Sequence, residues 1–341
     1  MNGNRPTVSI AMTTFNGMNY LEEQLSSLYA QDYAPCEIVI GDDGSTDGTY
    51  EFLQHQQARS PIPMRIVSNA ERLGWRENFM QTAARCSGDL IAFCDQDDVW
   101  TPGKLARMSA LFDDKAVTLG FHGASFIDAE SKTIGNLNAD ESGHVSVYKP
   151  LEIDFWRPVL GFSMVFKREL LNYNEYWKIS TDKLTLQERA AHDQWFLFLG
   201  SVFGDVVEVS DRLVNYRLHS SNAMGYRSSR RSFKSIIDAI KASKLKVTQR
   251  CDAINNRIAI LKAMMADGSG DRVRLSAALA AYEQHLEFNR ERMKLYSEKR
   301  IYKRFAKILN MVRNNRYASQ TLPLSNDETR RDYVISFLGV R

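Results

Sequence analysis

Along the first hundred residues, short apolar runs alternate with stretches in which apolar positions recur every three or four residues. Short apolar runs are typical of strands buried on both faces, and the longer repeat is typical of amphipathic helices. Their alternation predicts an α/β domain around a mainly parallel sheet with helices on both faces. The predicted strands are Thr7–Thr13, Glu37–Gly41, Met64–Val67 and Leu90–Cys94.

The pattern is less regular in the second half of this domain, where we expect mixed strand directions. The predicted strands there are Val117–Phe121, Ser163–Phe166, Val206–Val209 and Leu213–Leu218. A helix is predicted over Asp193–Leu199, and the polar segment Asp128–Pro150 predicts a loop over the site.

A different pattern follows residue 226. Apolar positions repeat at alternating spacings of four and three from Val247 to Met265 and again from Leu275 to Tyr296, with a glycine-containing break at Gly268. This predicts two long helices in an antiparallel hairpin. We therefore expect a catalytic domain over residues 1–226 and a basic helical region over residues 227–341.

Charge is divided unevenly between these parts. The net charge is +3, but residues 227–316 hold 22 Lys and Arg against 8 Asp and Glu, so the rest of the chain is acidic. The basic helices are open to two interpretations: a solvated outer face, or a surface that docks on the anionic inner leaflet. The segment Ile301–Val312 is the best candidate for an interfacial helix, and the hairpin is a candidate homodimer surface.

Cysteine usage and hydropathy favour a cytoplasmic protein that touches the inner membrane face at most peripherally. The four cysteines show no CxxC spacing and three of them lie in or beside apolar runs, as buried reduced thiols do. The amino terminus shows no signal-peptide pattern, and no run reaches the roughly 18–20 apolar residues that cross a bilayer.

Four polar clusters follow predicted strands or begin a helix. Asp42 and Asp43 end the second strand, where parallel sheets bind ligands, although Asp-Gly-Ser sequences also form plain turns. The run Asp95-Gln96-Asp97-Asp98 ends the fourth strand, and its like charges favour a divalent cation, Mg²⁺ or Mn²⁺, over an exposed acidic turn.

The other two clusters lie late in the predicted domain. Asp193 begins a helix and is a candidate general base, or else only a helix-starting carboxylate. Arg217 and His219 would share one side of a strand and reach phosphates or the metal, unless they are a surface pair. Together the clusters contain the parts needed to break a sugar–diphosphate bond.

With these clusters, the sequence resembles the family 2 glycosyltransferases of GT-A fold, most closely the bacterial branch often labelled rhamnosyltransferases. The resemblance covers about residues 7–225. Its motifs are Val8–Asn16, Asp42–Asp47, Phe93–Trp100, His192–Trp195 and Tyr216–His219. It implies an inverting transfer of rhamnose or a hexose from a nucleotide donor to a saccharide or lipid-linked acceptor in bacterial surface polysaccharide synthesis.

The resemblance also implies a role for each matching residue. Asp193 would be the catalytic base, and Asp97 and His219 would hold the metal. The nucleotide would be bound by Thr13, Phe15, Asn16, Asp42, Asp43 and Asp95. The diphosphate or the acceptor would meet Asp98, Trp100, His192 and Arg217.

The sequence departs from the family pattern at two places. His192 replaces a glutamate common in the family, and Gln194-Trp195 replaces the longer spacing to Arg-Trp of processive synthases, which argues against a processive polymerase.

Three alternative functions are less consistent with the sequence. A nucleotidyltransferase would need a basic glycine-rich loop after the first strand, which is missing here. A nucleic-acid-binding module is disfavoured by the acidic front half. A catalytically silent glycan- or nucleotide-binding relative is disfavoured by the presence of Asp95, Asp97 and Asp193 together.

Overall fold

The computed structural model describes residues 5–137, 143–219, 243–314, 316–317 and 332–334. The chain divides into two compact units. The first comprises residues 1–149, 158–174 and 191–226, and the second comprises residues 150–157, 175–190 and 227–341. This division differs from the predicted one because two short segments before residue 226 belong to the second unit.

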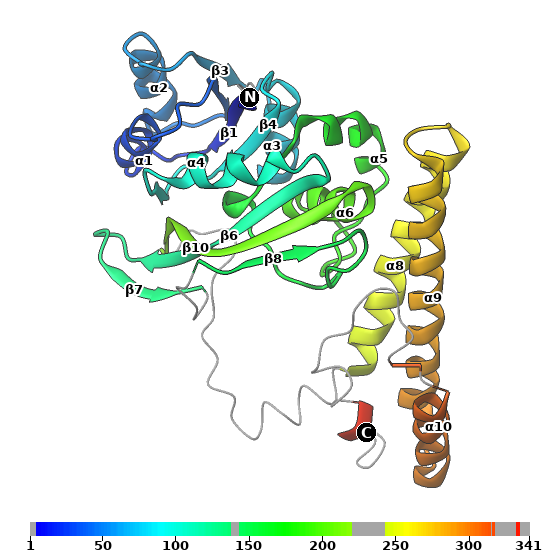
Figure 1. Ribbon diagram of the computed structural model, residues 1–341. Helices are drawn as coiled ribbons and strands as arrows, with labels where there is room; N and C mark the ends of the chain where they lie inside the picture. The colour runs from blue at the N-terminus through cyan, green and yellow to red at the C-terminus, as the bar shows by residue number, and fades with distance from the viewer. Residues whose placement is uncertain (1–4, 138–142, 220–242, 315, 318–331, 335–341) are drawn as a thin grey trace. The chain divides into compact units, whose positions relative to one another are not determined.

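A mixed sheet forms the centre of the first unit, with the strand order β3-β2-β1-β4-β9-β6-β10-β5 (Figure 1). Strand β7 pairs with β6, and β8 pairs with β10. The strands are β1 (Val8–Thr14), β2 (Glu37–Asp42), β3 (Met64–Ser68), β4 (Leu90–Cys94), β5 (Val99–Trp100), β6 (Val117–Ile127), β7 (Thr133–Asn136), β8 (Val145–Tyr148), β9 (Val165–Lys167) and β10 (Asp205–Arg217).

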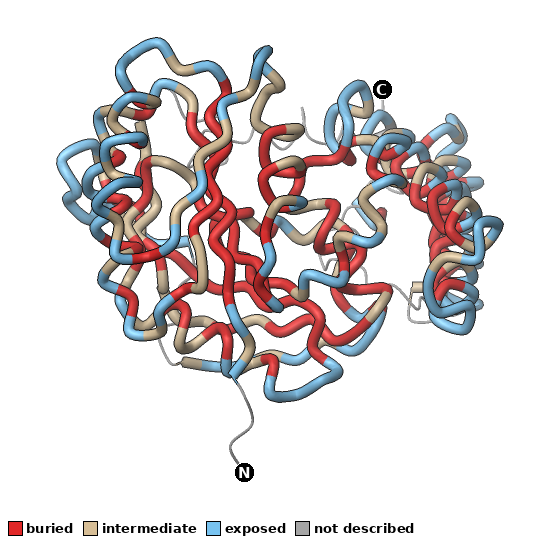
Figure 2. Tube along the Cα trace, turned by 90° about the horizontal axis from the view of Figure 1, so that it is seen from above, coloured by how far each residue is buried: buried red, intermediate tan, exposed pale blue. Residues whose placement is uncertain are grey.

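The first four strands are parallel neighbours and confirm the predicted α/β fold. The residues of β1, β2 and β4 are buried along almost the whole of each strand. Figure 2 shows long buried segments that run through the middle of the molecule's sheet-containing part. Strands covered on both faces can be apolar throughout, which is why the apolar runs in the sequence predicted these strands.

Helices cover both faces of this sheet. The helices before residue 220 are α1 (Leu21–Tyr29), α2 (Thr49–Gln57), α3 (Trp75–Ala84), α4 (Lys104–Ser109), α5 (Asn174–Trp177) and α6 (His192–Phe203). Side chains alternate along a strand. Ala92 and Cys94 join one core with residues of α1, α2 and α4, whereas Phe93 contacts Phe79 of α3 and Phe196 of α6.

Two predictions about the second half of the sheet were wrong. The segments expected as two strands after residue 205 form one strand, β10, with register irregularities between Val209 and Val214. The segment Asp128–Pro150, expected to be a loop, contributes β7 and β8. Strands β7 and β8 lie at the margin of the sheet, and each has at least one face exposed to solvent. They therefore lack the apolar runs that mark the central strands.

In the second unit, α8 (Ser243–Ala266) and α9 (Arg272–Ser297) form the predicted antiparallel hairpin. Val247, near the start of α8, packs with Leu295 and Tyr296 at the end of α9. Helix α10 (Ile301–Arg313) follows. None of the helices in the described ranges is both long and apolar enough to cross a membrane.

Candidate active site

The loop after β2 begins with Asp42, whose carboxylate organises a turn. It accepts hydrogen bonds from Thr14 Oγ1 at 2.8 Å, from Ser45 Oγ at 2.6 Å and from Ser45 N at 3.0 Å. The side chain is buried. Asp42 therefore ties β1 to the following turn, and its contact with the nucleotide stays a prediction.

Asp43 lies at a different place in the same loop. Its Oδ1 accepts from Leu73 N at 2.7 Å and from Asn69 Nδ2 at 3.0 Å, and its Oδ2 accepts from Gly74 N at 2.8 Å. Each carboxylate oxygen can accept two hydrogen bonds, so Oδ2 keeps one acceptor direction. This geometry allows Asp43 to accept one further donor, such as the imide N–H of a pyrimidine.

Beside these loops, the end of β1 carries an aromatic platform. The Arg72 guanidinium carbon lies 3.8 Å from the centroid of the Phe15 ring. Asn16 follows in the left-handed region with φ 51°, and its Oδ1 accepts from Thr46 N at 2.8 Å. Thr13 precedes the platform on β1 and is mostly buried. A planar base can stack on such a ring. The sequence alone did not single out Arg72, because a charged residue in an exposed loop belongs to no pattern that would mark it.

The acidic run after β4 contains a close pair with the end of β10. His219 Nε2 lies 2.7 Å from Asp97 Oδ2, and the histidine ring stacks on Tyr20 with centroids 5.2 Å apart. Each of the two paired side chains keeps 12% of its surface exposed. The pair links residues 122 positions apart and remains accessible.

Asp95 connects this pair with the first turn of α6. Burial, with the neighbouring charge of Asp97 and then that of Asp193 added, raises the pKa of Asp95 to about 7. Asp193 itself is half-buried, and its Oδ1 accepts from Gln194 N at 2.6 Å. The structure thus brings Asp95, Asp97, Asp193 and His219 into one electrostatic cluster at the carboxyl end of β4.

Two predicted ligand contacts, Asp98 and Trp100, lie beneath this cluster instead. Asp98 is fully buried and accepts from Arg217 N at 3.1 Å. Trp100 is also buried, with Lys104 Nζ 3.3 Å from the centroid of its ring. That ammonium donates to Phe162 O at 2.7 Å, and burial lowers its pKa to about 7. Asp98 and Trp100 support the loop and do not face a diphosphate or acceptor.

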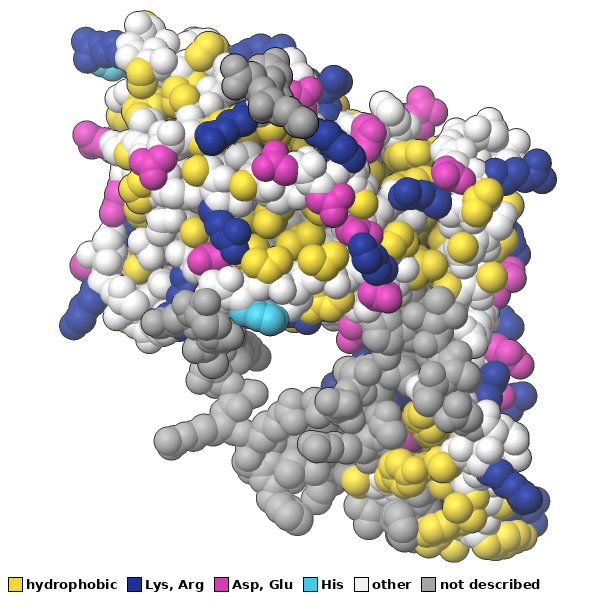
Figure 3. All heavy atoms as spheres, in the orientation of Figure 1, with side chains coloured by type: hydrophobic (Ala, Val, Ile, Leu, Met, Phe, Trp, Pro, Cys, Tyr) yellow, Lys and Arg dark blue, Asp and Glu magenta, His cyan; other side chains and the backbone are white. Residues whose placement is uncertain are grey.

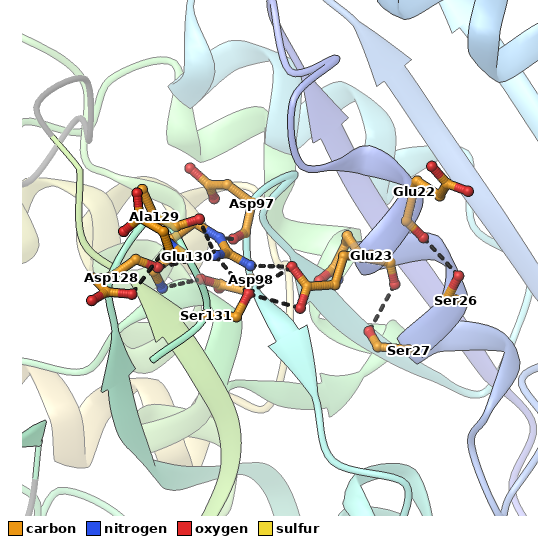
Figure 4. Close-up of polar contacts among 12 residues, drawn as sticks. Glu22, Glu23, Ser26, Ser27, Asp97, Asp98, Asp128, Ala129, Glu130 and Ser131 are labelled. Atoms are coloured by element: carbon orange, nitrogen blue, oxygen red, sulfur yellow. Dashed lines mark hydrogen bonds and ion pairs between the residues drawn. The ribbon is translucent and has the colours of Figure 1, made fainter. Parts of the chain in front are cut away.

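Arg217 also differs from its expected place (Figure 4). Its side chain is 1% exposed. The guanidinium donates from Nε to Asp97 O at 2.8 Å and from Nη2 to Glu23. Nη1 donates to Asp128 O, Ala129 O and Ser131 Oγ at 3.0 Å each. The close-up shows these acceptors converging from the acidic run, the turn after β6 and helix α1. Because protein acceptors surround the guanidinium, Arg217 is not placed to bind phosphate.

His192 is enclosed by aromatic rings. Its ring centroid lies 4.0 Å from that of Phe79, 4.6 Å from Phe93 and 5.8 Å from Trp75. Neither ring nitrogen has a hydrogen-bond partner within the described part of the chain. Burial, and secondarily Arg76, lowers the pKa of His192 to about 3. The expected contact with a diphosphate or acceptor is corrected: His192 is a neutral core residue beside Asp193.

We expect His192 to make the protein sensitive to acid. The unfolded chain binds a proton near pH 6.5 that the folded chain binds only near pH 3, so stability falls as the pH drops between these values. Going from pH 7.5 to pH 5 should cost about 2 kcal/mol at this residue. Urea unfolding at both pH values should show a smaller difference for His192→Leu, and no such reduction for the control His55→Gln, whose histidine is exposed.

No ready-made metal site is visible in the residues that the structure describes. Among them, no three His, Cys, Asp or Glu side chains are grouped so that they could hold a metal ion. Asp97 and His219 supply two suitable atoms only. A cation bound there would need further ligands from a substrate or from water.

The cluster lies at the carboxyl edge of the sheet, where open parallel sheets bind ligands. Residues 9–168 match the family model described as glycosyl transferase family 2, so this part of the chain is similar to that family. The solved structure of S. aureus TarS 1–349 has a similar GT-A fold, with a TM-score of 0.51 at 14% identity over 91% of this chain and 92% of that one.

Sequence relatives point to the same class of protein. An uncharacterised glycosyltransferase of Nostoc sp. is 25% identical over 228 residues, which is 63% of this chain and 66% of that protein. The dTDP-rhamnosyl transferase RfbG of Shigella flexneri is 25% identical over 224 residues, 63% of this chain and 73% of that protein. The match spans just under two thirds of the Nostoc relative's length.

Proposed function

We propose that this protein is an inverting glycosyltransferase that moves rhamnose or a hexose from a nucleoside diphosphate donor to a saccharide acceptor. The observation that carries the proposal is the cluster of Asp95, Asp97, Asp193 and His219 beside the two loops that carry Phe15 and Asp43. The printed name of one relative, a dTDP-rhamnosyl transferase, makes dTDP-rhamnose one donor to test, and bacterial surface polysaccharide synthesis is part of this proposal.

The donor's base would stack on Phe15 and donate its imide N–H to the remaining acceptor direction of Asp43 Oδ2. The ends of β2 and β4 flank β1 on its two sides, about 10 Å apart at the usual strand spacing. A nucleoside diphosphate is long enough to extend from Asp43 across the end of β1 to Asp97.

In the proposed reaction, the Asp193 carboxylate accepts the proton of an acceptor hydroxyl. The hydroxyl oxygen forms a bond to the anomeric carbon while the bond from that carbon to the diphosphate oxygen breaks. The nucleoside diphosphate leaves with the bonding electron pair. A displacement from the opposite face inverts the anomeric configuration. Positioned base catalysis of this kind contributes about 10²–10⁴-fold.

Asp97 and His219 would hold a divalent cation, Mg²⁺ or Mn²⁺. One carboxylate oxygen and one imidazole nitrogen fit a site that takes its other ligands from substrate phosphates and water, as Mg²⁺ sites at phosphates usually do. When bound, the cation would neutralise charge on the diphosphate. Arg217, Asp98 and Lys104 would hold the loop in place beneath it.

The test is a panel of sugar nucleotides, including dTDP-rhamnose and UDP-hexoses, incubated with Mg²⁺, Mn²⁺ or a chelator and with saccharide or lipid-linked acceptors. Release of nucleoside diphosphate that depends on the acceptor supports the proposal. A catalytically silent relative would bind a nucleotide and release none. The similarity of residues 9–168 to glycosyl transferase family 2 favours sugar transfer over the nucleotidyltransferase alternative.

We further propose that the enzyme acts in the cytoplasm with α10 against the anionic inner leaflet. The helix exposes Ile301, Leu309 and Val312 at 52%, 62% and 42% of their surfaces, and Lys303 and Arg313 are also exposed on it. Figure 3 shows hydrophobic and basic side chains on the part of the molecule where Figure 1 labels α10. Each basic residue near an anionic surface contributes about 1 kcal/mol. A second copy of the chain on these helices is the alternative occupant.

The wild-type protein should float with liposomes that contain anionic lipid and not with neutral ones. Leu309→Glu should weaken flotation at least several-fold, because a carboxylate replaces an apolar contact next to negative headgroups. Leu245→Glu is the matched control, since Leu245 is a leucine of α8 with 61% exposure. Equal flotation of both variants, or self-association without lipid that Leu309→Glu abolishes, would contradict membrane docking.

A further inference from the structure

The side chain of Gln96 occupies the place of a strand beyond the end of the β1–β4 ladder. The last residue pair in this ladder is Met12 with Cys94. Beyond it, β1 continues beside β2 as far as Thr14 and Asp42, whereas the other chain turns into the acidic run. The next backbone groups of β1 toward that run belong to Phe15, and they need partners.

The carboxamide of Gln96 satisfies both groups. Phe15 N donates to Gln96 Oε1 at 2.8 Å, and Gln96 Nε2 donates to Phe15 O at 3.1 Å. A glutamate could not make the second bond because it has no donor when ionised, and an asparagine is one methylene shorter. The arrangement needs an amide with this side-chain length.

Gly17 leaves the space in which this amide lies. A Cβ atom at position 17 would be 2.3 Å from Gln96 Oε1 and 2.6 Å from its Cδ. The three nearest atoms to that Cβ all belong to Gln96. Any larger residue at position 17 would therefore displace the carboxamide from Phe15.

We propose that Gln96 is a positioning residue that couples the base platform to the acidic run, an inference that rests on the proposed function. Gln96 lies between Asp95 and Asp97, so its two bonds fix the acidic run against the backbone of Phe15. The ring of Phe15 also stacks with the guanidinium of Arg72. A base bound on Phe15 thereby favours the loop position in which Asp97 meets the diphosphate.

The test measures the affinity of dTDP and UDP by calorimetry, with and without Mg²⁺, alongside the KM for the active donor and kcat. Loss of two neutral hydrogen bonds should weaken nucleotide binding about tenfold in Gln96→Ala and raise KM more than it lowers kcat. Gly17→Ala should have a similar effect. In the Gln96→Ala background, the added Gly17→Ala should change affinity less than about twofold, because the atoms it would strike are gone.

Gln57→Ala is the control for loss of a glutamine-to-backbone bond, since Gln57 Nε2 donates to Met64 O at 2.8 Å away from the site. Its nucleotide affinity should equal that of the wild type. Additive effects of Gly17→Ala and Gln96→Ala, or wild-type affinity in Gln96→Ala, would overturn the role of Gln96 alone. A wild-type protein that binds no nucleoside diphosphate would overturn the proposed function and this role with it.

Discussion

Asp193→Asn should lower the rate of sugar transfer about 10²–10⁴-fold and leave donor binding nearly unchanged. The substitution keeps the shape of the side chain but replaces the carboxylate with an amide. An amide cannot take the proton from the hydroxyl of the saccharide acceptor. Asp193 lies in the first turn of α6, and its charge contributes to the raised pKa of Asp95. Binding of the nucleotide depends on Phe15 and Asp43, which the substitution does not touch.

The measurement separates the two effects. Single-turnover transfer to the saccharide acceptor reports the chemical step, and calorimetry with the nucleoside diphosphate reports donor binding. Asp271→Asn is the matched control because Asp271 also begins a helix, accepting from Val273 N and Arg274 N at the start of α9. If Asp193→Asn transferred sugar at the wild-type rate, Asp193 would have no place in the mechanism.

The sequence was most informative about the central strands and the order of the motifs. Apolar runs covered on both faces identify β1, β2 and β4, and the first carboxylates after them mark the edge where ligands bind. Adjacent carboxylates were harder to separate. Asp42 and Asp43 have the same chemistry, and each accepts three hydrogen bonds. Only the positions of their donors show that Asp42 organises the turn at Ser45, whereas Asp43 holds the backbone of Leu73 and Gly74.

Burial of individual polar residues was beyond what the pattern could predict. His192 and Trp100 are buried by rings and by Lys104, and several of these partners lie far away in the sequence. Gln96 was passed over because glutamine is unremarkable in an acidic run until the backbone of Phe15 is placed beside it. Local spacing finds groups that share a strand or a helix face, whereas these contacts depend on tertiary packing.

Arg217 illustrates the same limit and leads to the second large effect. On a predicted strand next to His219 it looked like a phosphate ligand, yet its guanidinium joins three segments of the domain. Arg217→Met should lower the free energy of unfolding by about 3 kcal/mol, because Glu23 and the carbonyls of Asp97, Asp128 and Ala129 lose a donor. Transfer activity should be lost at temperatures where the variant is still folded, since the carbonyl of Asp97 is no longer held.

Arg217→Lys distinguishes a positioning role from a requirement for charge alone. A lysine keeps the charge but offers a compact ammonium in place of a planar fork of five donors, so it cannot reach all of these acceptors. We expect it to recover part of the stability and little of the activity. Arg212→Lys, on the same strand with a partly exposed side chain, is the matched control and should remain close to wild type.

Urea unfolding and donor KM, measured together, decide between the two roles. If Arg217 were a diphosphate ligand, Arg217→Lys would raise KM for the donor while leaving the unfolding midpoint unchanged. If it holds the acidic run, both Arg217 variants lower the midpoint, and Glu23→Gln lowers it less because Glu23 is about half exposed. The second pattern is expected because 99% of the guanidinium-bearing side chain is inaccessible to a ligand, so its effect on the diphosphate must pass through the backbone of Asp97 and the imidazole of His219.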